Sequence, residues 1–287
     1  MKKGTTPVFE VIVATHKPYQ MPTDPLYQPL LVGSNFFLKK QKDDILPQNL
    51  SFDNTGKHIS SKNLNYSELT GLYWLWQNQV KNDQNSDSFY GLAHYRRFLT
   101  SPTKKSILSK SELKTLVTGH KKNIKYDIIL PKKRHYYIET LYNHYAHTLH
   151  VEPLDRTREI IKDKHPEYLT EFDRLKNRRS AHMFNIFILR KDLFNQYCEF
   201  LFNVLFSLEE SFTKAEINQY DNFHARFFGR ISELLLDIFL YTRFPDLDQK
   251  SNVLELKVLE LEPVNWHQKI SNFLLAKFFG KKYHKSY

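Results

Sequence analysis

The sequence has few of the residues that mark several common protein classes. Its 287 residues include one cysteine, Cys198, so no disulfide can form within the chain, and this favours a reducing compartment. Cys198 falls in an apolar helical pattern, where a buried, inert thiol is expected. There are 8 glycines, and none stands in a G-x-G-x-x-G, Walker A or G-x-S-x-G pattern. The sequence therefore lacks the signatures of disulfide scaffolds, dinucleotide enzymes, P-loop hydrolases and serine hydrolases.

Long hydrophobic runs are also missing. No stretch reaches the roughly 18 consecutive apolar residues that a membrane-spanning helix needs. Residues 1–6 are short and polar, without the apolar segment of a signal peptide. We therefore expect a cytoplasmic protein.

Positive charge and aromatic residues are plentiful instead. Lysine and arginine number 42 against 31 acidic residues, which gives a formal net charge of +11. Such a charge favours an anionic partner: nucleic acid, a phosphorylated ligand or an anionic membrane. Aromatic residues make up 15% of the chain, enough to fill a core and still leave rings for stacking on bases or sugars. Composition alone does not choose among these partners.

Hydrophobic patterns predict alternating strands and helices. The expected strands cover residues 8–15, 89–93, 126–130, 183–189 and 253–261, and the expected helices cover residues 66–80, 109–117, 192–209 and 231–241. This alternation predicts an α/β fold with a mostly parallel central sheet flanked by helices. We expect one such domain over residues 1–262. Ligands of this kind of sheet bind beyond the carboxyl ends of its strands.

Two segments carry further local signals. Residues 17–54 contain five prolines and are expected to be rich in loops. Asn65 and Glu68 have the spacing of a capping box, which predicts the start of the helix over residues 66–80.

Polar clusters follow the predicted strands. They are Thr15-His16-Lys17, His94-Tyr95-Arg96-Arg97, Lys132-Lys133-Arg134-His135 and the residues around Asn185. In a parallel sheet the first three clusters would meet at one edge. Guanidinium groups pair bidentately with phosphate oxygens, so this edge is suited to a diphosphate. A solvated basic loop is the alternative for each cluster.

One carboxylate is a candidate general base. Glu233 lies three residues after Arg230, near the expected start of a helix, with Asp237 one turn further on the same face. Its alternative role is to stabilise the helix dipole.

No metal site is expected from the sequence. His144, His147 and His150 recur at a spacing of three residues, but no further ligand supports zinc. Asp43-Asp44 is only a weak signal, and no D-x-D pattern follows a strand.

Two segments resemble a known family. Residues 58–76 (HISSKNLNYSELTGLYWLW) and 90–98 (YGLAHYRRF) resemble a bacterial family of capsular and exopolysaccharide biosynthesis proteins, regarded as probable glycosyltransferases and long labelled a domain of unknown function. Its pattern includes N-I-S-x-x-N, E-L-T-x-x-Y-W-x-W and H-Y-R-R. The matching residues are Ile59, Ser60, Asn63, Glu68, Leu69, Thr70, Tyr73, Trp74, Trp76, Gly91, His94, Tyr95, Arg96, Arg97, Asp127, Pro131, Asn185, Arg226, Gly229 and Glu233. The sequence departs from the pattern at Lys57 and His58, and the resemblance covers roughly residues 11–242.

The resemblance implies a GT-A-like fold that binds a nucleotide-diphosphate sugar, with UDP as the expected nucleotide. It implies catalytic roles for Glu233, Arg96 and His94. It implies donor contacts for Thr15, His16, Lys17, Ser60, Lys62, Asn63, Tyr95, Arg97, Asn185 and Arg230. His94, Arg96 and Arg97 take the place where a D-x-D motif would hold a metal. A reaction without a divalent metal is therefore expected, with fixed cations stabilising the leaving diphosphate.

The C-terminal residues 263–287 form a separate basic segment. Residues 265–287 contain five lysines and no acidic residue, with apolar residues at helical spacing. Such a segment is suited to lying on an anionic membrane, although a packed terminal helix is equally compatible. We expect a peripheral protein at the inner face of the cell membrane that acts on a lipid-linked or glycan acceptor.

Two other functions remain open at this stage. A nucleic-acid-binding protein would explain the charge, but the basic residues are scattered and form no known motif, so no nucleic-acid partner is expected. A non-catalytic partner subunit of a polysaccharide assembly would share the family resemblance. The sequence leaves open the donor sugar, the acceptor and linkage, inversion or retention, and the oligomeric state.

Overall fold

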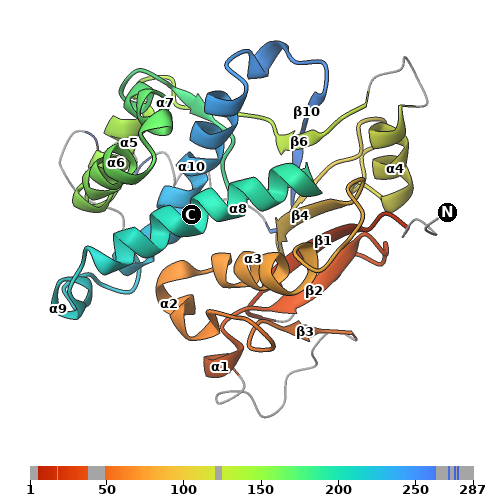
Figure 1. The fold of residues 1–287 in the computed structure, drawn as a ribbon, viewed down its shortest axis with the longest axis horizontal. Helices are drawn as coiled ribbons and strands as arrows, with labels where there is room; N and C mark the ends of the chain where they lie inside the picture. Colours follow the sequence, from red (N-terminus) through yellow and green to blue (C-terminus); the bar gives the residue numbers. More distant parts are fainter. Residues whose placement is uncertain are drawn as a thin grey trace. The chain divides into compact units, whose positions relative to one another are not determined.

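The computed structural model describes residues 6–17, 19–37, 49–119 and 125–262, together with Ser271, Leu275 and Lys277. The chain divides into two compact units (Figure 1). The first is built from Met1–Lys132, Phe184–Glu199 and Asp246–Leu261, and the second from Lys133–Met183, Phe200–Pro245 and Glu262–Tyr287. The predicted boundary between residues 262 and 263 lies at the edge of the described residues and stays a prediction.

The first unit contains the sheet. Its elements are β1 (Phe9–Thr15), β2 (Tyr27–Leu31), α1 (Ser34–Phe37), β3 (Ser51–Phe52), α2 (Asn63–Tyr66), α3 (Leu69–Leu75), β4 (Phe89–His94), β5 (Arg97–Leu99), α4 (Lys110–Thr118), β6 (Ile128–Pro131), β9 (Phe187–Arg190), β10 (Val253–Leu256) and β11 (Val258–Glu260).

The second unit is mostly helical. Its elements are β7 (Arg134–His135), α5 (Leu141–Thr148), α6 (Glu152–Lys164), α7 (Leu169–Asp173), β8 (Ser180–Ala181), α9 (Lys214–Asn218) and α10 (Phe227–Arg243). The long helix α8 (Lys191–Glu210) has residues in both units.

The strands of the first unit form one mostly parallel sheet. Among the described residues its main path runs β10-β6-β9-β4-β1-β2-β3, with β5 and β11 attached beside β4. Strand β1 pairs in parallel with β2 and β4, β2 with β3, and β6 with β10. Strand β9 runs antiparallel to both β4 and β6. The other strands of the path thus share one direction, which confirms the predicted α/β architecture.

Strand β1 is buried on both faces because helices cover both. Its residues Val11 and Val13 pack in one apolar cluster with Leu113 and Val117 of α4. On the other face, Gly71 of α3 approaches closely: a Cβ there would lie 3.0 Å from Leu30 of β2. Figure 1 shows α3 beside β1 and β2. A near-continuous run of apolar residues is the pattern that such a two-sided strand requires.

Glycine at position 91 allows β4 and β9 to approach. A Cβ atom there would lie 2.5 Å from the carbonyl oxygen of Phe187. Any larger residue would push the two strands apart. Gly91, which lies three residues before the H-Y-R-R motif, therefore has a structural role within the sheet.

The predicted helix over residues 66–80 is divided. Helix α2 ends at Tyr66, Ser67 takes a positive φ of 52°, and α3 begins only at Leu69. A π-helical turn, Trp76–Val80, completes the segment. The predicted capping box of Asn65 and Glu68 is wrong: Asn65 lies inside α2, and the Glu68 side chain caps nothing.

Other boundaries shift for local reasons. The strand expected over residues 183–189 begins at Phe187, because Phe184 and Asn185 have φ angles of 81° and 52°. The expected loop region of residues 17–54 contains β2, α1 and β3. Helix α10 begins four residues earlier than expected, at Phe227.

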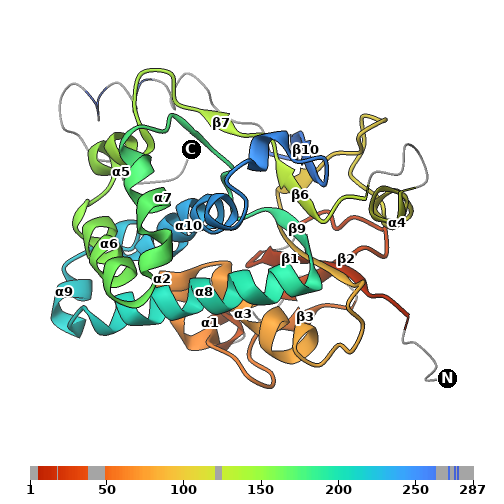
Figure 2. The same ribbon diagram turned by 45° about the horizontal axis from the view of Figure 1, so that its top comes forward.

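The second unit packs its helices through aromatic rings. Tyr168 stacks on Phe200 at 4.1 Å between centroids, and Phe200 lies 6.1 Å from Phe239 of α10. Both views place α6 and α7 beside each other next to α10 (Figure 2). His182 and Asp237 form a fully buried hydrogen bond of 2.5 Å between the β8 segment and α10. The high aromatic content is thus largely used in the core.

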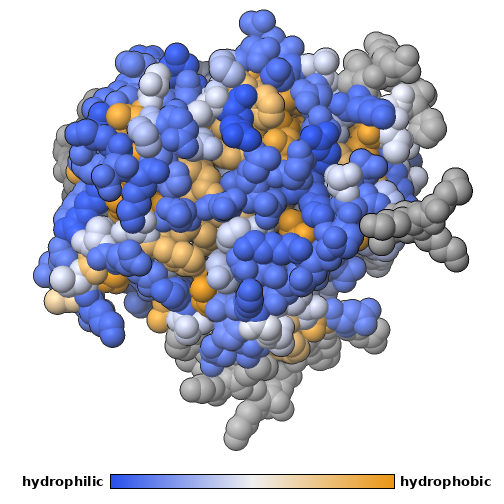
Figure 3. Space-filling model, in the orientation of Figure 1, coloured by the Kyte–Doolittle hydropathy of each residue, from blue (hydrophilic) through white to orange (hydrophobic). Residues whose placement is uncertain are grey.

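The surface seen in Figure 3 is dominated by hydrophilic residues, with small separate apolar areas. Within the described part of the chain, every helix is too short or too polar to cross a bilayer.

Candidate functional site

The ends of two neighbouring parallel strands bring two of the predicted polar clusters together. Ala14 of β1 pairs with His94 of β4, and the Tyr95 amide donates to the Ala14 carbonyl at 3.2 Å. Residues 15–17 and 94–97 therefore leave the sheet side by side. This confirms that the first two clusters meet at the carboxyl edge of the sheet.

The ring of Tyr95 is the centre of this edge. It is buried, with 5% of its surface exposed. The His16 ring contacts it edge-on at 5.3 Å, Lys17 Nζ lies 4.8 Å from its centroid, and Arg96 Cζ lies 5.9 Å away. These are distances at which cations are attracted to an aromatic face. One buried ring thus holds three nitrogen-bearing side chains close together.

Thr15 shapes the loop after β1. Its hydroxyl is buried and donates to the Lys17 carbonyl at 2.6 Å. Its carbonyl accepts from the Val32 amide at 2.9 Å. Thr15 therefore fixes the turn that carries His16 and Lys17.

His94 at the end of β4 lies against a shielded carboxylate. Its Nε2 is 3.7 Å from Glu68 Oε2, and the two side chains are 18% and 11% exposed. The amide of Asn185 donates to the other Glu68 oxygen at 2.7 Å. Burial by itself would raise the pKa of Glu68, but the hydrogen bonds and charge of His94 and the Asn185 amide outweigh it and lower that pKa to about 2. Glu68 is thus a fixed negative charge behind His94.

Unusual backbone flanks this contact on both sides. Ser67, just before Glu68, has a φ of 52°, and Phe184 and Asn185 have φ angles of 81° and 52°. Asparagine tolerates this region, whereas serine and phenylalanine rarely adopt it. Strain of this kind is concentrated at functional sites and in ligand-binding segments. The fold holds Glu68 and Asn185 together at a conformational cost.

The second nitrogen of His94 is available for a ligand. Among the described residues, Nδ1 of His94 has no hydrogen-bond partner, although it is buried. Because Nε2 faces Glu68, Nδ1 is the nitrogen of His94 that remains for a hydrogen bond to a ligand.

Arg97 points to a different neighbour. Its Nε lies 3.6 Å from Glu260 of β11, which is its cross-strand partner, and its guanidinium lies 4.3 Å from the centre of the Phe184 ring. The charge of Arg97 is therefore partly balanced by Glu260.

Ser60, a predicted donor contact, is part of a buried network. Its hydroxyl donates to Asp53 at 2.6 Å. Asp53 is fully buried and also accepts from the Thr70 hydroxyl and from the amides of Gly33 and Ser34, at 2.6, 2.9 and 3.0 Å respectively. The structure thus gives Ser60 a structural role in joining this loop to α3.

Asn63 and Lys62 lie next to this network. The Asn63 amide donates to the Ser67 carbonyl at 2.8 Å and to the Thr70 hydroxyl at 3.1 Å. Asn63 therefore supports the unusual backbone that precedes Glu68. The Lys62 ammonium lies 5.9 Å from the ring of Tyr66.

The two tryptophans of the E-L-T-x-x-Y-W-x-W segment have structural partners. Trp74 donates to Thr55 at 2.9 Å, and Trp76 donates to Asn195 at the start of α8 at 2.9 Å. In the same segment Thr70 donates to Asp53, and Glu68 contacts His94. The motif therefore combines several structural contacts with one site residue.

Sequence reasoning missed the roles of Glu68 and Asp53. The capping-box spacing assigns Glu68 to a helix cap, although its position in a family motif, with His94 in the next motif, is a usable signal. Asp53 stands alone in a loop region, and no local pattern marks it.

The predicted base, Glu233, lies in the second unit with Arg230. Glu233 and Arg230 both affect the pKa of Tyr136. Burial raises this pKa to about 12; the charge of Glu233 also raises it, whereas the charges of Arg134 and Arg230 lower it. Glu233 is half-buried and lies well inside α10, whose first turn has no acidic residue. The alternative role of Glu233 at a helix start is therefore wrong. Its neighbour on the same face, Asp237, is committed to His182.

The third polar cluster is divided between the units at Lys132 and Lys133. Lys133 donates to the Tyr241 hydroxyl at 2.6 Å, and the Arg134 guanidinium lies 5.1 Å from the Tyr136 ring. The meeting of this cluster with the other two stays a prediction.

The histidines at positions 144 and 147 bind a carboxylate. Their Nδ1 atoms lie 3.0 and 2.6 Å from the oxygens of Glu139, which is 4% exposed. Over the described ranges, no cluster of histidine, cysteine and acidic residues has an arrangement suited to a metal ion. Asp43-Asp44 lies outside the described residues.

Residues 10–244 match the family described as "Domain of unknown function (DUF4422)". The chain belongs to this family. Among solved structures, the chain is similar to the apo structure of WbbM, a bifunctional glycosyltransferase, with a TM-score of 0.74 and 26% sequence identity. No curated protein matches the chain.

The similarity to WbbM covers 90% of this chain and 46% of that one, so the chain spans about half the length of the WbbM structure. The DUF4422 region begins in β1 and ends just after α10. It thus contains His94 and Glu68 of the first unit as well as Arg230 and Glu233 of the second.

Proposed function

We propose that this DUF4422 protein is a glycosyltransferase that uses a nucleotide-diphosphate sugar, most simply a UDP-sugar. The main support for this proposal is the arrangement of side chains at the polar edge of the sheet. There Glu68 contacts His94, and the charged groups of Lys17 and Arg96 lie near the ring of Tyr95. The likeness to a glycosyltransferase structure supports the same reaction class.

The chemistry of such an edge suits a leaving diphosphate. When the bond between the sugar C1 and the diphosphate oxygen breaks, negative charge develops on that oxygen. A guanidinium from Arg96 and an N–H from His94 would stabilise it, as preorganised donors do in other transfer reactions. The contact with Glu68 would keep His94 in the orientation that this donation needs. In this proposal the reaction needs no divalent metal.

Glu233 is the proposed general base. Its carboxylate would take the proton of the acceptor hydroxyl, the hydroxyl oxygen would bond to C1, and the nucleoside diphosphate would leave from the opposite side. This assignment applies to an inverting transfer. Arg230, one turn earlier on α10, would bind phosphate groups of the donor or of the acceptor.

The remaining donor contacts follow the predicted set. His16 and Lys17 would contact the nucleoside or its phosphates, with Thr15 holding their turn. Lys62 is the proposed contact to base or ribose, while Ser60 and Asn63 act through the Asp53 network. Asn185 would act through Glu68.

The proposed setting is surface-polysaccharide assembly, with a lipid-linked or glycan acceptor at an anionic membrane. The basic segment of residues 263–287 supports this part of the proposal.

A screen of nucleotide sugars by thermal unfolding tests the donor class. A ligand at 100 times its Kd stabilises a protein by about 2.7 kcal/mol, which gives an easily measured shift. We expect UDP or a UDP-sugar to shift the transition, and Lys105→Ala, a change at an exposed lysine of the first unit, to leave the shift intact. The absence of a shift with every nucleotide sugar would remove the transferase proposal.

Activity tests the cationic mechanism. We expect Arg96→Ala to lower the rate of transfer or donor hydrolysis about 10²-fold, the typical cost of losing one transition-state donor. Lys105→Ala again serves as the control. Loss of activity in EDTA, or near-normal activity of Arg96→Ala, would contradict a reaction stabilised by fixed cations.

A further inference from the structure

An exposed apolar turn stands out on the second unit. Tyr137 and Ile138, between β7 and α5, are 82% and 53% exposed, whereas most large apolar side chains of the described chain are buried. Two adjacent exposed residues of this size are unusual on a water-facing surface and mark contact sites. Tyrosine is also a residue that favours the boundary between water and lipid.

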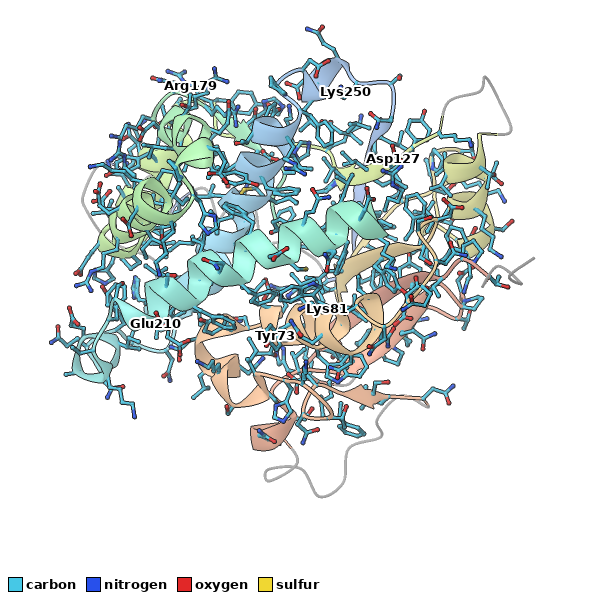
Figure 4. All side chains as sticks on the ribbon, in the orientation of Figure 1. Tyr73, Lys81, Asp127, Arg179, Glu210 and Lys250 are labelled. Atoms are coloured by element: carbon cyan, nitrogen blue, oxygen red, sulfur yellow. The ribbon has the colours of Figure 1, made fainter. Side chains whose placement is uncertain are left out.

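Basic side chains surround this turn. Arg179 donates to the Tyr137 carbonyl at 3.1 Å, and the His135 ring lies 6.2 Å from the Tyr137 ring. Figure 4 labels Arg179 at the outer edge of the second unit. Arg174 and Lys176, which precede Arg179 in the chain, are also exposed. The turn is thus an apolar tip within a basic rim.

The acidic residues near the tip do not cancel this charge. Glu139 is buried and bound by His144 and His147. Glu171 is also buried and forms ion pairs with both Arg174 and Arg178. The two positive charges of these arginines outnumber the one negative charge of Glu171. Neither carboxylate offers an exposed negative charge to a partner.

One described lysine of residues 263–287 contacts the same tip. The Nζ atom of Lys277 donates to the Ile138 carbonyl at 3.0 Å. Apolar and basic residues from three separate parts of the chain share one surface.

We propose that this surface, formed by Tyr137, Ile138, His135, Arg179 and Lys277, docks on an anionic lipid bilayer. The apolar tip would enter the headgroup region while the basic groups pair with lipid phosphates. Charge complementarity together with paired apolar residues favours a bilayer over a free phosphate ligand. The inference rests on the membrane setting of the proposed function but concerns a different surface from the donor site.

Vesicle co-sedimentation of the full chain tests the proposal. Vesicles of phosphatidylcholine with phosphatidylglycerol are compared with vesicles of phosphatidylcholine alone. We expect binding only to the anionic vesicles. The double variant Tyr137→Ser/Ile138→Ser should bind about tenfold more weakly, since apolar burial is lost. Arg179→Glu should weaken binding by at least about fivefold, because each basic group contributes at the charged surface.

Matched variants on the first unit provide the controls. Leu64→Ser removes an apolar side chain that is 65% exposed, and Lys105→Glu reverses an exposed charge. Both should bind vesicles as the wild type does. Equal binding of the tip and control variants, or equal binding to neutral and anionic vesicles, would overturn the proposal.

Donor-induced thermal stabilisation is measured on the same variants. The tip variants should keep it, because their changes lie outside the proposed donor site. Loss of vesicle binding with intact donor binding supports the docking surface, whereas absent donor binding in the wild type refutes the transferase proposal and leaves the vesicle result to be judged alone.

Discussion

At the scale of single residues, two shielded carboxylates of the first unit behave in opposite ways. Glu68 has a pKa lowered to about 2 by His94 and Asn185, against the effect of its burial. Glu10 of β1 has a pKa raised to about 7, because burial dominates over its hydrogen bond with Gln79. The balance between burial and the hydrogen bonds and charges of the neighbours sets the direction of each shift.

The stabilising effect of Glu68 should depend on pH. Its folded pKa lies below its unfolded value of about 4.5, so its contribution is present above that value and is lost as pH falls toward about 2. We expect Glu68→Gln to be less stable than the wild type at pH 6, and the difference to shrink by about 2 kcal/mol at pH 3. Urea unfolding of both proteins at the two pH values measures this. A difference that does not change with pH would contradict an ionised, paired Glu68.

Glu10 should show the opposite sign. It lies beside a cavity of about 210 Å³, lined also by Gln28, Ser51 and Gln79. Because its folded pKa is raised, ionisation costs stability as pH rises from about 4.5 to about 7. Glu10→Gln should therefore be more stable than the wild type at pH 8, by up to about 3 kcal/mol, with no pH-linked gain at pH 4. Urea unfolding of the wild type and of Glu10→Gln at both pH values measures this difference. If the variant is more stable than the wild type by the same amount at pH 4 as at pH 8, the raised pKa of Glu10 is refuted.

At the scale of elements, Asp53 ties a loop to helix α3. Its two oxygens accept from two backbone amides and two hydroxyls, those of Ser60 and Thr70. The same network reaches Asn63 and the backbone before Glu68. The position of Glu68 thus also depends on the network around Asp53.

We expect Asp53→Asn to destabilise the first unit by about 3 kcal/mol, because an amide would place a donor against existing donors in a buried site. Asp87→Asn, at an exposed aspartate, should change stability by less than about 0.5 kcal/mol. Thermal or urea unfolding of the two variants makes the comparison. Similar stability of both variants would show that the network carries little energy.

At the scale of the whole molecule, the net charge of +11 raises the question of unspecific nucleic-acid binding. Such binding arises from counterion release and falls steeply with salt. The donor site is proposed to use a few partly buried groups, which salt screens less.

Raising NaCl from about 0.05 to about 0.3 M should therefore abolish most RNA retention while leaving most of the donor-induced thermal shift. Filter binding and thermal unfolding in the same buffers measure both. RNA binding that survives the higher salt, together with no donor shift, would favour a nucleic-acid-binding protein.

The sequence by itself determined the α/β alternation, because β-branched runs and helical periodicity are local signals. It also placed His94 to Arg97 at the end of a strand, and parallel pairing then brought them beside His16 and Lys17. These features depend on neighbours along the chain and on a general rule of parallel sheets.

The tertiary structure alone decided the partners of individual side chains. Glu68 meets Asn185 across 117 positions of the sequence, and Asp53 gathers donors from three segments. The sequence around Tyr137 and Ile138 does not distinguish them from buried apolar residues, and only the folded structure shows that their side chains are exposed. Such contacts form only when distant segments pack, so no local pattern encodes them.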